Sequence, residues 1–146
     1  MNATRITRML ILSESQVRQC LSMPDALLAT RQAFVALAQG KAHVPTRLGL
    51  PYNKKKAATD DSNTDNKSEA QDWTLFKPAM TLDEDNPQMG CKIVSIRAEN
   101  PSRNLPLVPA TVFSVDAPSG QVQAVVAGTY LTAARTAAGS ALATAW

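Results

Sequence analysis

The chain has 146 residues, enough for one ordinary domain, and its hydrophobic fraction of 45% is sufficient for a core. Its 15 basic and 12 acidic residues leave a formal charge of +3, spread along the chain, and aromatic residues make up only 5%. These values argue against a nucleic-acid-binding protein, and no apolar run approaches the roughly 20 residues that a membrane-spanning helix needs.

The N-terminal segment predicts a first strand. Residues 9–12 form an apolar run that is shorter than the hydrophobic core of a signal peptide, so we interpret it as the lead into a strand. Arg5 and Arg8 precede this run without any acidic residue, which leaves a targeting peptide as the alternative. We therefore expect a cytoplasmic protein.

Two helices are predicted next, each by its N-terminal capping signal. Ser13 and Gln16 have the spacing of a capping box, and Ser22 and Asp25 repeat it with a proline in the first turn. Gly40 ends the second helix. An apolar stripe of the second helix, expected to face the core, consists of Leu27, Phe34, Leu37 and Ala38.

A polar insertion follows the extended, proline-containing segment that comes after Gly40. Residues 53–72 contain no Val, Ile, Leu or aromatic residue and many Lys, Asp, Asn and Ser residues. Such a segment buries too little apolar surface to offset the entropy of ordering it, so we expect a disordered loop. The lysine run 54–56 leaves a nuclear signal as an alternative.

The second half of the chain predicts a sheet and a final helix. Pro118 and Gly120 lie in turn positions and indicate a hairpin, and an alanine-rich helix is expected from Leu131 to the end. The strands are expected within residues 73–80, 89–98, 108–116 and 121–128. Together these elements predict an α+β fold in which the N-terminal helices pack on a mixed or antiparallel sheet.

The cysteines and the histidine favour no metal or disulfide chemistry. Cys20 and Cys91 lie far apart and outside any C-x-x-C motif, which indicates two free thiols. His43 is the only histidine and cannot bind a metal alone. We expect no metal site.

Three cations have unusual sequence settings. Arg47 lies among apolar residues after a proline, Lys92 lies within an apolar strand, and Arg135 is the only charge of the final helix. Because Lys and Arg are rarely buried without a partner, a convergent set of cations would suit a small carboxylate ligand. The alternatives are a surface position for Arg47, a sheet-edge position for Lys92, and an internal ion pair for Arg135. A cation in the first turns of a helix is also mildly unfavourable, which hints at an anionic partner for Arg135.

Several motifs resemble the ornithine cyclodeaminase/mu-crystallin family. The final segment LTAARTAAGSALATAW is similar to the family's L-T-x-x-R-T-A-A helix, and MGCKIVSI is similar to its G-x-K-x-V strand. The P-T-R segment, FKPAM and the PATVF hairpin fall in the family's order. The resemblance covers nearly the whole chain except residues 53–72, which would be an insertion.

This resemblance implies an enzyme that uses NAD or NADP and acts on the C–N bond of an amino acid or a cyclic imino acid. It implies that Arg47, Lys92 and Arg135 bind the substrate, with Lys92 also catalytic near the reacting nitrogen and Arg135 also at the cofactor. A threonine on the nicotinamide side of cyclodeaminases would fall at Leu107. That departure, together with PATVF, favours the mu-crystallin branch and its ketimine reduction over ornithine cyclodeamination.

The resemblance also implies the domain organisation. Residues 1–130 would form a substrate-binding and dimerisation domain, and residues 131–146 would form the helix that leads into a Rossmann domain absent from this sequence. We therefore expect the chain to be truncated, to bind little or no nicotinamide cofactor and to be inactive alone, to form a homodimer, and to have no nucleic-acid or membrane partner. The alternative is a non-catalytic, crystallin-like binding or scaffold protein that dimerises.

Overall fold

The structure is a computed structural model that describes residues 8–52, 72–83 and 86–145. The described residues form a seven-stranded sheet in the order β1-β7-β6-β5-β4-β2, with β3 also paired to β4. All strand pairs are antiparallel except β1–β7, which is parallel. The strands are β1 (Leu10–Leu12), β2 (Ala42–His43), β3 (Leu48–Tyr52), β4 (Asp72–Thr81), β5 (Gln88–Ile96), β6 (Ala110–Asp116) and β7 (Val122–Ala127). This mixed sheet with its helices confirms the α+β class.

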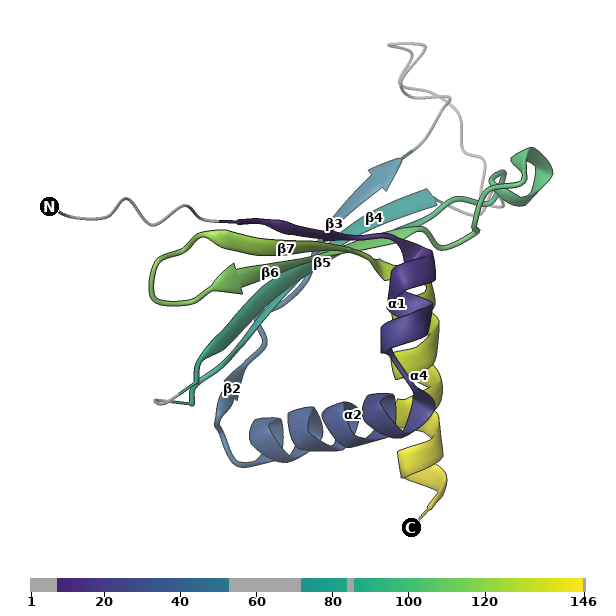
Figure 1. Cartoon of the computed structure of the whole chain (residues 1–146). Helices are drawn as coiled ribbons and strands as arrows, with labels where there is room; N and C mark the ends of the chain where they lie inside the picture. The colour runs from purple at the N-terminus through teal and green to yellow at the C-terminus, as the bar shows by residue number, and fades with distance from the viewer. Residues whose placement is uncertain (1–7, 53–71, 84–85, 146) are drawn as a thin grey trace, which may run out of the picture.

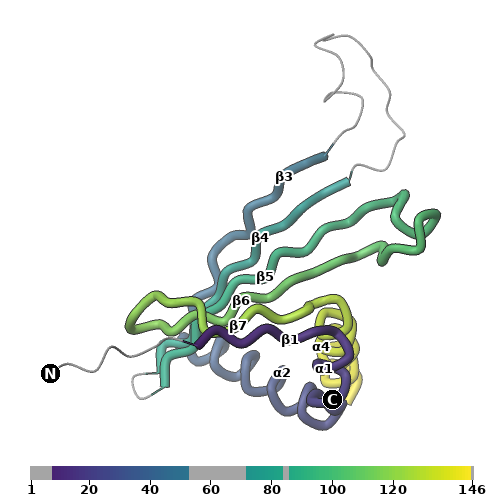
Figure 2. Tube along the Cα trace, turned by 45° about the horizontal axis from the view of Figure 1, so that its top comes forward, coloured from purple at the N-terminus to yellow at the C-terminus, as the bar shows by residue number. Residues whose placement is uncertain are grey.

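The helices α1 (Glu14–Cys20), α2 (Met23–Ala38) and α4 (Gly128–Thr144) lie on one side of the sheet, with α1 and α4 side by side (Figures 1 and 2). A short 3-10 helix, η1 (Pro101–Arg103), lies between β5 and β6. No described helix lies on the opposite face of the sheet (Figure 2), which we call the open face. Since Lys92 contacts Thr132 of α4, the alternation along the paired strands places Ile93 and its partner Phe76 on the open face. The same register places Ile11, whose exposed fraction is 67%, on that face.

Both predicted capping boxes are confirmed. The Ser13 amide donates to Oε1 of Gln16 at 2.9 Å, and the Gln16 amide donates back to Oγ of Ser13 at 3.4 Å. Ser22 and Asp25 make the same reciprocal pair at the start of α2. Each box satisfies two amide groups that have no partner within the helix, so the sequence signal and the structure agree.

The predicted core stripe of α2 is wrong for most of its residues. Phe34 and Leu37 have exposed fractions of 56% and 49%, Ala38 is exposed, and Leu27 is half-buried. The physical reason is that α2 packs mainly on α4 and β2, so the rest of its surface, including most of the predicted stripe, is not covered. Ala26 is the residue of α2 that is buried.

Helix α4 begins at Gly128, three residues before the predicted start at Leu131. A Cβ at Gly128 would lie 3.0–3.1 Å from the backbone of Ala110 and Thr111, so this glycine lets the helix start against β6. The start has no side-chain cap, which explains why the sequence did not reveal it. Arg135 therefore lies in the third turn, beyond the reach of the unfavourable N-terminal dipole that its expected position implied.

The predicted loop of residues 53–72 is one residue too long at its C-terminal end. Asp72 belongs to β4, where it pairs with Tyr52 of β3, so it is not part of a loop. Residues 53–71, including the lysine run 54–56, lie outside the described residues, and so does Arg5. The predicted hairpin is confirmed, because the Gly120 amide donates to the Asp116 carbonyl at 2.7 Å and Gly120 has a φ of 71°.

Candidate functional site

Strand register places three cations in one row on the helix-covered face. Lys77 of β4 lies directly opposite Lys92 of β5. Leu48 pairs with Phe76, so the preceding residue, Arg47, is next to Lys77 when the β3–β4 pairing is continued by one position. Residues opposite each other in antiparallel strands project from the same face. We call Arg47, Lys77 and Lys92 the cation row.

Helix α4 adds two polar groups to the row. Nζ of Lys92 donates a hydrogen bond of 3.4 Å to Oγ1 of Thr132, which fixes the row on the face that α4 covers. Arg135 follows Thr132 by three positions, a spacing that makes neighbours on a helix surface. The site is thus built from a sheet and one helix, two rigid elements.

Burial and neighbouring positive charges lower the pKa values of both lysines of the row. Burial, then the charges of Arg135 and Lys77, lower the pKa of Lys92 to about 8. Burial, then the charges of Arg47 and Arg135, lower the pKa of Lys77 as well. Among the carboxylates of residues 8–52, 72–83 and 86–145, none raises either pKa.

The cations also lack acidic partners within the described part of the chain. The ion pairs Arg18–Glu14 and Arg103–Glu99 both lie on the surface and involve none of the four cations. The cation row and Arg135 therefore form a positively charged site that no described carboxylate neutralises. Such a site suits an anionic ligand, because buried or half-buried charges are stabilised by a partner of opposite sign.

The structure explains why glycine stands at position 90, the first residue of the G-x-K motif. A Cβ at this position would lie 2.8 Å from the backbone oxygen of Phe113 on β6, which is closer than atoms can pack. Glycine therefore permits the close approach of β5 and β6 two residues before Lys92, and it helps to set where Lys92 stands.

The structure brings together Arg47, Lys92 and Arg135, the three cations singled out from the sequence. Lys92 is half-buried, whereas Arg47 and Arg135 are exposed. Sequence reasoning missed Lys77 and Thr132. Lys77 carries the same signal that drew attention to Lys92, a lysine inside an apolar strand, whereas nothing in the sequence indicates the Lys92–Thr132 contact.

Leu107 is not part of this group. Leu107 lies before the start of β6 and five residues ahead of Val112, the residue of β6 that pairs with Lys92. Leu107 has an exposed fraction of 48%, and its carbonyl accepts a hydrogen bond of 3.0 Å from the Arg97 amide. Its contact with a nicotinamide stays a prediction.

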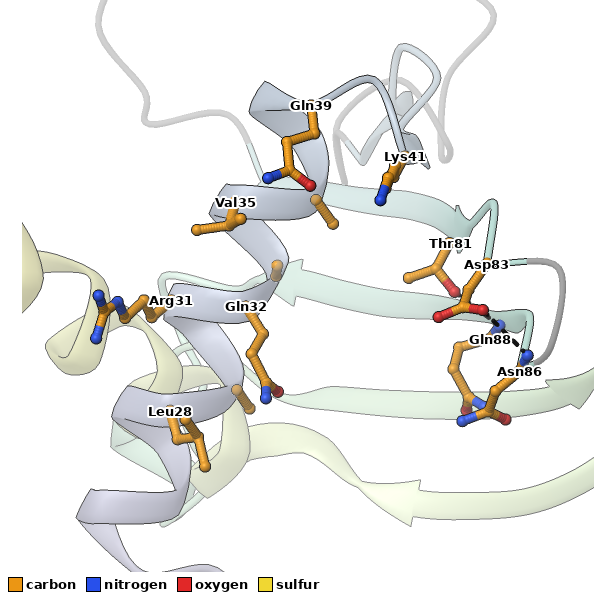
Figure 3. Close-up of a pocket in the computed structure, with 13 residues that line it drawn as sticks. Leu28, Arg31, Gln32, Val35, Gln39, Lys41, Thr81, Asp83, Asn86 and Gln88 are labelled. Atoms are coloured by element: carbon orange, nitrogen blue, oxygen red, sulfur yellow. Dashed lines mark hydrogen bonds between the residues drawn. The ribbon is translucent and has the colours of Figure 1, made fainter.

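A hollow of about 750 Å³ lies elsewhere, between α2 and the turn that joins β4 to β5. We call it the α2 hollow, and Figure 3 shows Gln32 and Val35 of α2 on one side of it and Thr81 and Gln88 on the other. None of the sequence-predicted site residues lines it. Its lining is mixed, and it does not concentrate cations as the cation row does.

The described part of the chain offers no metal or disulfide chemistry. Cys20 and Cys91 are free, as predicted. No group of three or more His, Cys, Asp and Glu side chains is placed to hold a metal ion within residues 8–52, 72–83 and 86–145. Over the same ranges, none of the helices combines the length and the hydropathy that crossing a membrane requires.

Comparison with known proteins gives a consistent result. The sequence model of the ornithine cyclodeaminase/mu-crystallin family matches residues 7–146. A relative described as an uncharacterized cyclodeaminase, from Dictyostelium discoideum, is 37% identical over 134 residues. That match covers 92% of this chain and 36% of the relative, so the chain spans little more than a third of the relative's length.

Solved structures share the fold. The Δ1-pyrroline-2-carboxylate reductase of Thermococcus litoralis, in complex with NADH and L-proline, is 31% identical with a TM-score of 0.75, over 92% of this chain and 36% of that one. An archaeal alanine dehydrogenase, solved as a dimer with bound NAD, is 28% identical with a TM-score of 0.73, over 90% and 34%. The similar proteins are therefore nicotinamide-dependent enzymes of amino-acid or imine chemistry.

Proposed function

Because the chain belongs to the ornithine cyclodeaminase/mu-crystallin family, we propose that it is the substrate-binding part of an NAD(P)-dependent enzyme that acts on the C–N bond of an amino acid or a cyclic imine. The observation that carries the proposal is the group of cations on one face of the sheet without an acidic partner among the described residues. Residues 1–130 provide the substrate and dimerisation domain, and residues 131–146 provide the connecting helix.

The arginines and the lysine have different roles in binding the substrate. The guanidinium groups of Arg47 and Arg135 have the planar fork that pairs with both oxygens of a carboxylate. They orient the substrate, which lowers the entropic part of the barrier. Lys92 lies beside Arg135 and near the reacting nitrogen, and a pKa of about 8 lets it hold or release a proton close to neutral pH.

The described residues do not fit the dinucleotide itself. Tight pyrophosphate binding uses open backbone amides at a glycine-rich turn between a strand and a helix. At the β7–α4 junction the only glycine, Gly128, packs against Ala110, and at the β1–α1 junction the Ser13–Gln16 box occupies the amides. This supports the proposal that residues 1–146 alone bind no nicotinamide cofactor tightly and do not turn over substrate. Arg135 and Leu107 would then only border the nicotinamide end of the cofactor.

Leu107 favours ketimine reduction over cyclodeamination. A leucine side chain cannot donate or accept the hydrogen bond that a threonine would supply at that position. Reduction of a cyclic ketimine is therefore the activity we favour, with ornithine-type cyclodeamination second. A non-catalytic binding protein that dimerises is the remaining candidate, favoured by the apolar open face alone.

A titration tests the substrate-binding proposal. L-Proline, a stable cyclic amino acid, is titrated by calorimetry into the purified chain and into Arg47→Ala, Arg135→Ala and the control Arg31→Ala. Because Arg47 and Arg135 are exposed, the loss of either charged partner costs up to about 1 kcal/mol, so we expect roughly two- to fivefold weaker binding in the first two variants. Arg31 lies on α2, and its variant should bind like the wild type. Equal affinity in all four proteins would refute the proposal.

A further inference from the structure

The hydroxyl group of Thr132 points from α4 toward the sheet. Thr136 turns its hydroxyl back along the helix and donates to the carbonyl of Thr132 at 2.7 Å. Thr144 does the same with the carbonyl of Ser140 at 3.2 Å. Thr132 instead presents Oγ1 to β5, where it accepts the hydrogen bond of 3.4 Å from Nζ of Lys92. The hydroxyl of Thr132 is therefore part of the site and not of the bonding within its own helix.

Lys92 benefits from such a partner because its charged neighbours repel it. Among the described residues these neighbours are Lys77, opposite on β4, and Arg135 on α4, and the partner of Lys92 on β6 is an uncharged valine. Arg47 continues the row beyond Lys77. A lysine side chain is flexible along its stem, so repulsion can displace its ammonium group in several directions. The hydroxyl of Thr132 is an uncharged acceptor on the α4 side, and the bond to it opposes this displacement.

We propose that Thr132 is a positioning residue, which holds the ammonium group of Lys92 at the place where it meets the ligand. The inference rests on the proposed function, because it takes Lys92 as the group beside the reacting nitrogen. It also gives a role to the threonine of the L-T-x-x-R segment. Thr132 and Arg135 are three positions apart and are neighbours on the helix surface, so α4 fixes the lysine and carries the carboxylate-binding arginine together.

Two substitutions of Thr132 separate positioning from packing. Thr132→Val keeps the branched shape and removes the hydroxyl, whereas Thr132→Ser keeps the hydroxyl and removes a methyl group. Thr136→Val is the matched control, since its hydroxyl bonds within the helix one turn further on. The pKa of Lys92 is measured in the free 146-residue chain by NMR titration of the lysine side chains, and its signal is identified by its loss in Lys92→Arg. The affinity for L-proline is measured by calorimetry from about pH 6.5 to about pH 9.5, a range that spans the titration of Lys92.

A hydroxyl oxygen that accepts from an ammonium group favours its charged form, so Thr132→Val should lower the pKa of Lys92 by about half a pH unit or more. L-Proline should bind about two- to fivefold more weakly to this variant at pH 7, and the pH midpoint of its affinity should fall with the pKa of Lys92. Thr132→Ser and Thr136→Val should behave like the wild type. An unchanged pKa of Lys92 in Thr132→Val, or a serine variant that behaves like the valine variant, would overturn the inference and leave Thr132 a packing role.

The two measurements also keep this inference separate from the proposed function. If the wild type does not bind L-proline, the proposed function is contradicted, and the NMR titration, which needs no ligand, still decides whether Thr132 holds Lys92. If L-proline binds with the same affinity and pH midpoint in the wild type and Thr132→Val, the proposed function stands and the positioning role is removed.

Discussion

At the residue scale, the charge of Lys92 links ligand binding to pH. Its pKa is lowered to about 8, whereas an unfolded chain holds the lysine proton to about pH 10.4. The native state is therefore disfavoured by this charge below pH 8, and stability recovers as the pH rises from about 8 to about 10.4. A bound carboxylate compensates the charge and holds the proton in place.

We therefore predict that carboxylate binding takes up a proton near pH 8. The affinity should fall about tenfold between pH 7 and 9.5, because the free site has lost the Lys92 charge at the higher pH. Calorimetry in buffers of different ionisation enthalpy measures the proton uptake. Lys92→Arg keeps its charge and should reduce the uptake. Constant affinity and no uptake in the wild type would show that Lys92 does not face the ligand.

A second residue-scale prediction concerns Gly90. Gly90→Ala should lower the free energy of unfolding by about 1–3 kcal/mol, because the added methyl group would lie 2.8 Å from the Phe113 backbone oxygen. The matched control is Gly139→Ala on α4, where the nearest atoms are 3.9 Å away and alanine is the better helix former. Denaturant unfolding of both variants checks this. A Gly90→Ala protein as stable as the control would mean that β5 and β6 separate easily.

At the element scale, the features that depend on residues within one helical turn could be predicted from the sequence. The features that depend on contacts with distant elements could not. Ser13 and Ser22 cap helices through residues three positions away, so the sequence showed both helix starts. Gly128 starts α4 because Ala110 of another strand lies against it, and no local residue reveals this. Phe34 is exposed for a similar reason, since its burial depended on which elements cover α2.

The same reasoning predicts that residues 53–71 can be replaced by a two-residue Asn-Gly turn. Tyr52 and Asp72 are directly paired at the ends of β3 and β4, which is the geometry that a tight hairpin closes. Shortening the connection should leave stability unchanged or raise it by up to about 2 kcal/mol. Thermal unfolding measures the effect, with a scrambled 53–71 sequence of equal length as the control. A protein that loses its folded spectrum would show that the segment is needed for the sheet.

At the scale of the whole molecule, the site and the open face depend on strand register. Arg47 and Lys92 are far apart in the chain, and only the pairing through β4 places them in one row. Sequence reasoning found Arg47, Lys92 and Arg135 through their apolar settings and the resemblance. It missed Lys77, although Lys77 lies within an apolar strand as Lys92 does, and only the strand register shows that it stands beside Lys92.

The open face predicts a homodimer. Ile11 is highly exposed and belongs to an apolar sheet face that no described helix covers, which is the kind of surface that mediates association. Ile11→Lys should raise the dimer dissociation constant at least tenfold in sedimentation experiments. Leu28→Lys, at an apolar position on α2 with an exposed fraction of 58%, should not change it. Identical association of the wild type and Ile11→Lys would place the interface elsewhere.

The most direct measurement of the central claim is a crystal structure of the chain with L-proline. We predict that the carboxylate lies within hydrogen-bond distance of the guanidinium group of Arg47 or Arg135 and of Nζ of Lys92, on the helix-covered face of the sheet. The α2 hollow is the competing location, because its volume of about 750 Å³ accommodates a small molecule. L-Proline bound in the α2 hollow, with the cation row unoccupied, would contradict the account.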